Sequence, residues 1–321
     1  MSIRTIGVLT SGGDAPGMNA AIRAVVRTAL GLGIKVYGIH RGFNGLIEGD
    51  VTEMNLRSVS DIIHRGGTIL YTARSPLFKT KEGVKAAVEN CQKFGIEGIV
   101  VIGGDGSFRG AADLSAEGIP CIGIPGTIDN DISSTQYTIG FDTAMNTAME
   151  MIDKLRDTSQ SHDRCSVVEV MGRGAGHLAL QTGIAVGATY IILKEAPYSV
   201  KEICEKIKTT QKLGKKHFII IVSEDVTDVV ALAKEIEEMS GVEARATVLG
   251  HVQRGGSPTV RDRRIASLMG SYAVNLLKNN KGNRVVSFQN AVVVDYDIQE
   301  ALSMKKTIDI NEYNTANSIS I

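Results

Sequence analysis

Two apolar runs, each followed by a glycine-rich segment with carboxylates, constrain the fold of this chain more than any other feature. The first covers residues 99–102 and precedes Gly-Gly-Asp-Gly-Ser; the second covers residues 121–124 and precedes Pro-Gly-Thr-Ile-Asp-Asn-Asp. Continuous apolar runs rich in β-branched residues are typical of buried parallel strands, and ligands bind at the carboxyl ends of such strands. We therefore expect Asp105, Asp129 and Asp131 to meet at one edge of one sheet.

The residue types in these two segments indicate phosphate chemistry. Glycine lets backbone N–H groups approach an anion closely, and the positive end of a following helix adds attraction. Carboxylates among such amides are explained when a divalent cation or a transferable proton lies between them and the phosphate.

Length, charge and cysteine usage exclude several classes of protein. At 321 residues the chain is longer than a typical single core, so we expect two domains. The 35 basic and 35 acidic residues cancel and no basic tract stands out, which argues against nucleic acid as a partner. The four cysteines form no Cys-x-x-Cys pair, the apolar runs are too short to span a membrane, and no signal peptide is seen. We expect a cytoplasmic protein without a membrane segment.

The first glycine-rich turn lies between a strand expected at residues 3–9 and a helix expected at 20–32. This layout suits phosphate, but ordinary strand-to-helix turns share it, and no Gly-Lys-Ser/Thr follows as in a P-loop. On the helix, Arg23 and Arg27 share one face, where they either face solvent or hold a phosphate. Arg74 follows a short strand expected at 69–73, either as a phosphate clamp or as a surface residue.

The remaining pattern predicts further strand and helix pairs. Expected strands are 35–39, 165–170, 190–193, 218–223 and 243–249, with a hairpin at 284–288 and 291–294; expected helices are 59–64, 82–94, 107–117, 142–158, a helix ending near 186, 200–213, 229–240 and 262–277. Each arginine near these strand ends, taken singly, is a candidate for a surface salt bridge. Taken together with a histidine and a glutamate, they indicate a receptor for a phosphorylated polyol. The residues concerned are Arg164, Arg173, Glu224, Arg245, His251 and Arg254.

These motifs carry a resemblance that covers almost the whole chain. The sequence resembles the bacterial ATP-dependent 6-phosphofructokinases. The segments that match are 10–19, 103–107, 125–131, 171–173 and 250–256. Gly-Gly-Asp-Gly alone also occurs in kinases that act on dinucleotides or lipids, whereas the four later segments in this order are specific.

The resemblance implies a fold and an activity. It implies two doubly wound α/β domains with mostly parallel sheets, facing each other across an active-site cleft. Residues 1–139 with 252–304 would bind ATP, and residues 140–251 with 305–321 would bind the sugar phosphate. The implied reaction transfers a phosphoryl group from ATP to the 1-hydroxyl of fructose 6-phosphate, with Mg²⁺, in glycolysis. The implied assembly is a homotetramer.

The resemblance also implies roles for single residues. The ATP site would comprise Gly12, Arg74, Ser75, Gly104, Asp105, Gly106 and Ser107. Asp105 would bind Mg²⁺ with Asp131 close by, Asp129 would be the base, and Thr127 and Arg173 would steady the moving phosphoryl group. The sugar phosphate would contact Thr127, Ile128, Asp129, Met171, Gly172, Arg173, Glu224, His251, Val252, Gln253 and Arg254, with Arg164 and Arg245 from a neighbouring subunit.

The resemblance also implies the phosphoryl donor and the regulation, each from a few single positions. The pyrophosphate-using relatives carry Asp at the position of Gly106 and Lys at that of Gly126, so the two glycines indicate ATP. An effector site for ADP or phosphoenolpyruvate is implied at Arg23, Arg27, Asp61, Arg156, Gly187, Lys215, Lys216 and His217. The chain departs from the family at Leu56, Thr189 and Leu213, so we expect an anion to bind with a weak or altered response.

Two other functions were weighed on the same residues. A dinucleotide or lipid kinase would leave Arg173, Glu224 and the His251–Arg254 segment without a role. A nucleotide-sensing subunit without activity predicts damage at Asp105, Asp129 or Arg173, and all three residues are intact.

Overall fold

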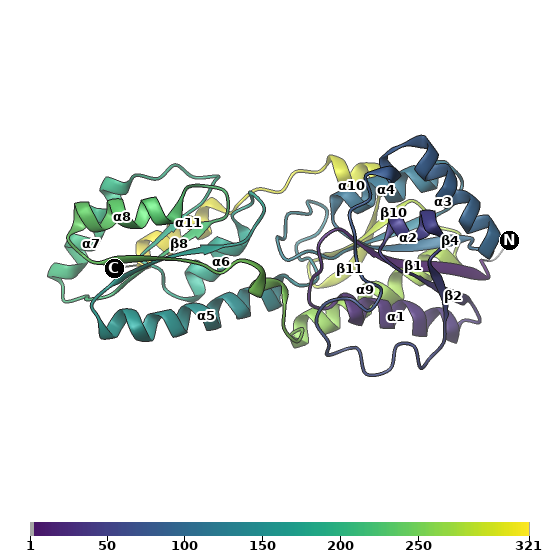
Figure 1. The fold of residues 1–321 in the computed structure, drawn as a ribbon, viewed down its shortest axis with the longest axis horizontal. Helices are drawn as coiled ribbons and strands as arrows, with labels where there is room; N and C mark the ends of the chain where they lie inside the picture. The colour runs from purple at the N-terminus through teal and green to yellow at the C-terminus, as the bar shows by residue number, and fades with distance from the viewer. Residues whose placement is uncertain (1–2, 321) are drawn as a thin grey trace. The chain divides into compact units, whose positions relative to one another are not determined.

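The computed structural model describes residues 3–320, and the chain divides into two compact units, each with its own sheet (Figure 1). The first unit comprises the described residues up to 128 together with 132–143 and 254–306. The second comprises 129–131, 144–253 and the residues from 307 on.

The first unit contains a seven-stranded sheet in the order β11-β10-β5-β4-β1-β2-β3. Its strands are β1 (Thr5–Ser11), β2 (Lys35–Ile39), β3 (Val51–Met54), β4 (Gly98–Gly103), β5 (Cys121–Pro125), β10 (Arg284–Gln289) and β11 (Val292–Asp297). Only the two outermost strands, β3 and β11, run antiparallel to their neighbours. The central strands β4 and β5 are completely buried, because helices cover both faces of the sheet.

Helices of the first unit lie on both faces of its sheet (Figure 1). They are α1 (Met18–Gly31), α2 (Phe43–Glu48), the 3-10 turn η1 (Leu77–Lys79), α3 (Lys81–Phe94), α4 (Asp105–Ala116), α9 (Val260–Lys278) and α10 (Ile298–Ser303). Helices α1 and α9 pack against each other on one face. Helices α2, α3, α4 and α10 cover the other, where Phe43, Phe78, Phe108 and Leu114 form a core with Ile99 of the sheet.

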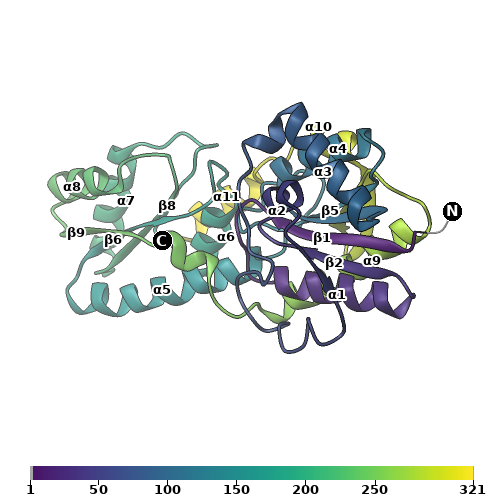
Figure 2. The same ribbon diagram turned by 45° about the vertical axis from the view of Figure 1, so that its right-hand side comes forward.

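The second unit repeats this plan with a four-stranded, fully parallel sheet in the order β7-β8-β6-β9. Its strands are β6 (Cys165–Val170), β7 (Tyr190–Ile192), β8 (Phe218–Ser223) and β9 (Ala244–Val248). Its helices are α5 (Phe141–Ser161), α6 (His177–Ala185), α7 (Val200–Lys212), α8 (Val229–Ser240) and α11 (Ile310–Ile319). The 3-10 turn η2 (Gly250–Arg254) follows β9. One core joins α7 and α8 to the sheet, and a second core joins α5, α6 and α11 to its other face (Figure 2). The predicted α/β class with mostly parallel sheets is therefore confirmed.

Two expected elements are wrong. Residues 59–64 form turns rather than a helix, and residues 69–73 form no strand. Side chains from the first glycine-rich turn and the strand before it hold this segment: Asn19 Nδ2 donates to the carbonyls of Arg65 and Gly66, and Asn19 Oδ1 accepts from the Ile69 N–H at 2.8 Å. Thr10 Oγ1 donates to the Tyr71 carbonyl at 2.7 Å. These bonds satisfy the backbone without a helix or a sheet partner.

The structure can be compared with two expectations from the sequence, on the cysteines and on membrane-spanning helices. All four cysteines are buried and free, and burial raises the pKa of the Cys91 and Cys165 thiols to about 12. Such thiols are inert structural groups rather than nucleophiles. No helix within residues 3–320 is both long and apolar enough to cross a membrane.

Candidate active site

Three loops meet at the carboxyl edge of the first sheet because β1, β4 and β5 are neighbours in register. Ser11 of β1 pairs with Gly103 of β4, and Gly103 pairs with Pro125 of β5. The loops that follow therefore bring Gly12, the segment 104–107 and the segment 126–127 to one edge. Ligands of open α/β sheets bind at this kind of edge.

Hydrogen bonds tie the predicted ATP residues of this edge together. Ser107 Oγ donates to the Ser11 carbonyl at 3.0 Å, so the loops after β1 and β4 are joined. Gly12 has φ +91°, a conformation that favours glycine, and its carbonyl accepts from Thr72 Oγ1 at 2.8 Å. Thr72 thereby fixes the segment that carries Arg74 and Ser75 beside Gly12. Sequence reasoning missed Thr72, because only a long-range contact reveals it.

The start of α4 is built to receive an anion. Gly104 precedes the helix and brings no side-chain cap, and Asp105 is the first residue of the helix. A Cβ added at Gly104 or Gly106 would meet no atom within 4 Å. No atom therefore fills the space beside these two glycines at the positive end of a helix of 12 residues, which suits a phosphate.

Arg254 lies against the loop after β1. A Cβ at Gly13 would lie 2.9 Å from Arg254 Nη1, and the same nitrogen is 3.9 Å from Asp14 Oδ1. Within η2, Arg254 belongs to the first unit, whereas His251, Val252 and Gln253 belong to the second. His251 and Val252 are exposed.

The loop after β5 is fixed by backbone and side-chain bonds. The Thr127 N–H donates to the Ile139 carbonyl at 3.1 Å, and Thr138 Oγ1 donates to the Thr127 carbonyl at 2.7 Å. Residues 129–131 group with the second unit; Asp129 is buried and Asn130 has φ +52°. The expected meeting of Asp105 with Asp129 and Asp131 stays a prediction.

The second unit brings five predicted sugar-site residues together at its own carboxyl edge. Glu224, after β8, accepts through Oε2 from the N–H groups of Gly172 (3.1 Å) and Arg173 (3.0 Å). Gln253 is completely buried, and its Oε1 accepts from the Met171 N–H at 3.4 Å. The loop after β6 is thus held by side chains from β8 and η2.

Arg164 and Arg245 do not join this group within one chain. Arg164 immediately precedes β6, and Arg245 pairs with Ser166 near the amino end of β6. The loop that carries Arg173 follows the other end of that six-residue strand, about 20 Å away. Glu243 binds both arginines, with 2.8 Å between its Oε2 and Arg164 Nε, and the Arg164 hydrogen bond lowers the pKa of Glu243. Sequence reasoning missed Glu243.

The residues expected at an effector site are distributed over both units. In the second unit Arg156 donates to the Val186 carbonyl, and burial followed by the Arg156 charge lowers the pKa of both Lys215 and His217. Gly187 has φ +59°, and Lys216 is exposed. The Thr189 N–H donates to the Ile219 carbonyl at 2.7 Å.

In the first unit, burial and then Arg27 lower the pKa of Arg23. No ion pair within residues 3–320 joins either arginine to a carboxylate, and Asp61 has φ +54°. Arg27 is exposed and Arg23 is half-buried, and the choice between a solvated face and a phosphate site for this pair stays a prediction.

Comparison with known proteins gives the class. The phosphofructokinase family model matches residues 5–277. ATP-dependent 6-phosphofructokinases of Clostridioides difficile and Bacillus subtilis are 58% and 55% identical over 319 residues, covering 99% of this chain and 100% of each relative. The chain belongs to the phosphofructokinase family.

Solved structures agree on the fold. The phosphofructokinase of Saccharomyces cerevisiae matches with a TM-score of 0.89 and 33% identity, over 99% of this chain and 48% of the yeast chain. A pyrophosphate-dependent phosphofructokinase of Marinobacter aquaeolei matches with a TM-score of 0.86 over 96% of this chain and 86% of its own. At 22% identity that likeness concerns the fold alone.

Proposed function

We propose that this protein transfers the γ-phosphoryl group of ATP to the 1-hydroxyl of fructose 6-phosphate, giving fructose 1,6-bisphosphate and ADP in glycolysis. The observation that carries the proposal is the 58% identity, over the full length, to a protein named ATP-dependent 6-phosphofructokinase. A glycolytic role goes with a cytoplasmic location.

The donor side of the reaction uses the edge of the first sheet. Gly12, Arg74, Ser75 and the segment 104–107 bind ATP, with backbone N–H groups and the start of α4 facing its phosphates. Open space at Gly106 accommodates a nucleotide where a carboxylate would repel its α-phosphate. ATP rather than pyrophosphate is therefore the donor.

Mg²⁺ fits the carboxylates available here. Within residues 3–320 no group of three or more His, Cys, Asp or Glu side chains forms a metal cage. Mg²⁺ is commonly bound by one or two carboxylates together with substrate phosphates and water, so Asp105 with Asp131 would hold it. The bound ion would neutralise charge on the triphosphate.

The chain's own residues move the proton and steady the charge. The 1-hydroxyl oxygen forms a bond to the γ-phosphorus while the bond from that phosphorus to the ADP oxygen breaks. Asp129 takes the hydroxyl proton, and Thr127 and Arg173 donate hydrogen bonds to the transferred group. A positioned base of this kind typically contributes about 10²–10⁴-fold to the rate.

The acceptor binds through the second unit and a neighbouring subunit. Ile128, Met171, Gly172 and Glu224 contact the sugar, and the segment 251–254 holds the 6-phosphate. Arg164 and Arg245 complete the phosphate site of the next subunit in a homotetramer. Their position at the amino end of β6 and β9 supports this, because it separates them from the Arg173 loop of their own chain.

An anionic effector such as ADP or phosphoenolpyruvate binds at the basic residues Arg23, Arg27, Arg156, Lys215 and Lys216, together with His217, Asp61 and Gly187. Leu56 and Leu213, both exposed, and the buried Thr189 bring no charge to this site. We therefore expect weak regulation, and ordinary strong activation by ADP in fructose 6-phosphate saturation curves would contradict this.

The acceptor assignment is tested by offering ATP with fructose 6-phosphate, with a nicotinamide dinucleotide and with diacylglycerol in parallel. We expect ADP release only with fructose 6-phosphate, together with fructose 1,6-bisphosphate in equal amount. Faster turnover of either other acceptor would replace this proposal with a different kinase of the Gly-Gly-Asp-Gly type.

A further inference from the structure

The loop that carries Arg173 needs support from outside itself. Arg173 has φ +50° and is followed by Gly174 at φ +77°, so two successive residues adopt the left-handed conformation. For a residue with a Cβ this conformation is uncommon and is kept when surrounding contacts impose it. The contacts that impose it decide where the Arg173 guanidinium can reach.

Two carboxylates grip the backbone of this loop, one at each end. Glu224 accepts from the N–H groups of Gly172 and Arg173, as described above. At the other end, Glu195 Oε1 accepts from the Gly176 N–H at 2.8 Å. Gly176 precedes the first residue of α6 and has no side-chain cap of its own, so the Glu195 carboxylate also lies at the positive end of that helix.

The fit between Glu195 and Gly176 is close. A Cβ at Gly176 would lie 2.7 Å from Glu195 Oε2, so the carboxylate would have to shift if this residue were not glycine. On the same segment, Lys194 Nζ lies 3.2 Å from where a Cβ of Gly174 would be. The segment after β7 therefore contacts the Arg173 loop at two points.

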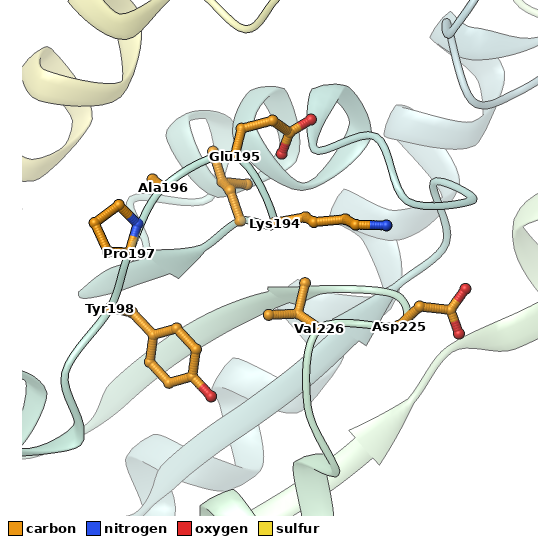
Figure 3. A pocket seen from close by; sticks show the side chains of 8 residues that line it. Lys194, Glu195, Ala196, Pro197, Tyr198, Asp225 and Val226 are labelled. Atoms are coloured by element: carbon orange, nitrogen blue, oxygen red, sulfur yellow. The ribbon is translucent and has the colours of Figure 1, made fainter.

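Figure 3 shows how this segment is arranged. Lys194 and Glu195 extend to the same side, away from Pro197 and Tyr198. A cavity of about 640 Å³ is lined by residues 193–198 with Asp225 and Val226. Beside this cavity, the bond from Glu195 and the side chain of the buried Leu193, which packs against Gly176, join the segment to the loop.

We propose that Glu195 is a positioning residue for phosphoryl transfer, which acts on Arg173 through the Gly176 N–H. The inference rests on the proposed role of Arg173. Glu195 touches neither substrate nor nucleotide in this account. Its loss releases one end of the loop while Glu224 still holds the other, so kcat falls and KM for fructose 6-phosphate changes little.

The first experiment compares three variants of the full-length protein. Glu195→Ala removes the acceptor and is expected to lower kcat about three- to tenfold, which is within the range for one lost hydrogen bond of ordinary strength. Glu195→Gln keeps a side-chain oxygen for the Gly176 N–H and is expected to stay within about twofold of the unmodified protein. Asp228→Ala is the matched control, because Asp228 likewise accepts from backbone N–H groups at the start of α8. It should lower the thermal midpoint and leave kcat and KM unchanged.

The second experiment asks whether Glu195 acts through Arg173. In an Arg173→Met background, we expect Glu195→Ala to cause almost no further loss of kcat, because the group it positions is gone. A full additional loss in that background, or an unchanged kcat for Glu195→Ala alone, would overturn the proposal. An unchanged kcat for Arg173→Met alone would instead reject the role proposed for Arg173.

A further variant keeps the test valid if Glu195→Ala does not fold. Gly176→Ala retains the carboxylate, but its Cβ would lie 2.7 Å from Glu195 Oε2 and 2.9 Å from Leu193 Cδ2, so both side chains must shift, while the backbone at φ −80° accepts alanine. We expect the same fall in kcat with little change in KM. Unchanged kinetics in a folded Gly176→Ala protein would contradict the proposal.

Discussion

At the scale of single residues, the chemistry depends on a few side chains whose neighbours are fixed by backbone contacts. The residues next to the glycine-rich motifs could be predicted from the sequence, since Gly12, Gly104 and Ser107 lie beside the strands whose register joins them. Thr72, Glu195 and Glu243 could not, because each acts through a hydrogen bond to a residue between 19 and 79 positions away. No local pattern marks such a partner.

Asp129 is the residue whose removal should affect turnover most selectively. The Asp129→Ser variant is expected to lower kcat by about 10²–10⁴-fold, the usual contribution of a positioned base, while both substrates still bind. Steady-state kinetics with equilibrium binding of fructose 6-phosphate measures the two effects separately. Near-normal turnover would refute the assignment of the base.

Gly106 tests the choice of donor. Asp at this position meets no atom near its Cβ, so the fold should tolerate it, but its charge would repel the α-phosphate of ATP. We expect Gly106→Asp to raise KM for ATP at least about tenfold. Gly106→Ala, which adds only a methyl group in open space, is the control and should keep normal ATP kinetics. Equal ATP kinetics in the two variants would end the donor argument.

At the scale of elements, apolar periodicity predicted the buried strands and long helices, and side-chain bonds explain what it missed. Residues 69–73 were misassigned because Asn19 and Thr10 bind the backbone of Ile69 and Tyr71. Residues 59–64 instead form turns, with bonds from the Ser60 N–H to the Arg57 carbonyl and from the Arg65 N–H to the Ile62 carbonyl. The short α2 was missed because Gly42, Gly45 and Gly49 obscure its pattern, and β3 was missed because its four residues are too few to show an alternation. A Cβ at Gly45 would lie 1.7 Å from the His40 carbonyl, so this turn exists only with glycine.

The junction between α9 and the start of α5 depends on one buried carboxylate. Asp262 accepts from the N–H groups of Gly140 and Thr143, both at 2.9 Å, and from Thr143 Oγ1. Burial raises the pKa of Asp262 to about 6, from an ordinary value of 3.8. The folded state therefore binds this proton more tightly than the unfolded state, and its contribution to stability is complete below pH 4 and lost as the pH rises through 6.

The Asp262→Asn variant tests whether the stabilisation by Asp262 falls as the pH rises. The variant should be less stable at every pH, because an amide cannot accept three donors. The advantage of the unmodified protein should shrink by up to about 3 kcal/mol between pH 4 and pH 7, from the pKa difference converted at 1.36 kcal/mol per unit. Thermal unfolding of both proteins between pH 4 and pH 7 measures this difference in stability. A constant difference between the two midpoints would contradict the shifted pKa.

At the scale of the whole molecule, chain length predicted two domains and the order of the motifs predicted the family, whereas the proposal that the site needs a neighbouring subunit rests on strand direction. Arg164 and Arg245 lie at the amino end of β6 and β9, and the Arg173 loop follows the carboxyl end. One chain cannot bring the two together without breaking its sheet. In the proposed homotetramer, a neighbouring subunit would supply these arginines.

Mixed oligomers test this sharing of residues. Asp129→Ser and Arg245→Ala proteins, each inactive alone, should regain activity when their subunits are exchanged by mild dissociation and reassembly. With random mixing, about a quarter of the sites would combine an intact Asp129 with an intact neighbouring Arg245. Absence of recovery, in mixtures that demonstrably exchange subunits, would show that each chain builds its own site.

The most direct test of the central claim is the rate of fructose 1,6-bisphosphate formation from fructose 6-phosphate, measured first with ATP and then with pyrophosphate. The account predicts sustained formation with ATP, matched by ADP release, and at least about 100-fold lower kcat/KM with pyrophosphate. Equal or faster formation with pyrophosphate, or none with ATP, would contradict it.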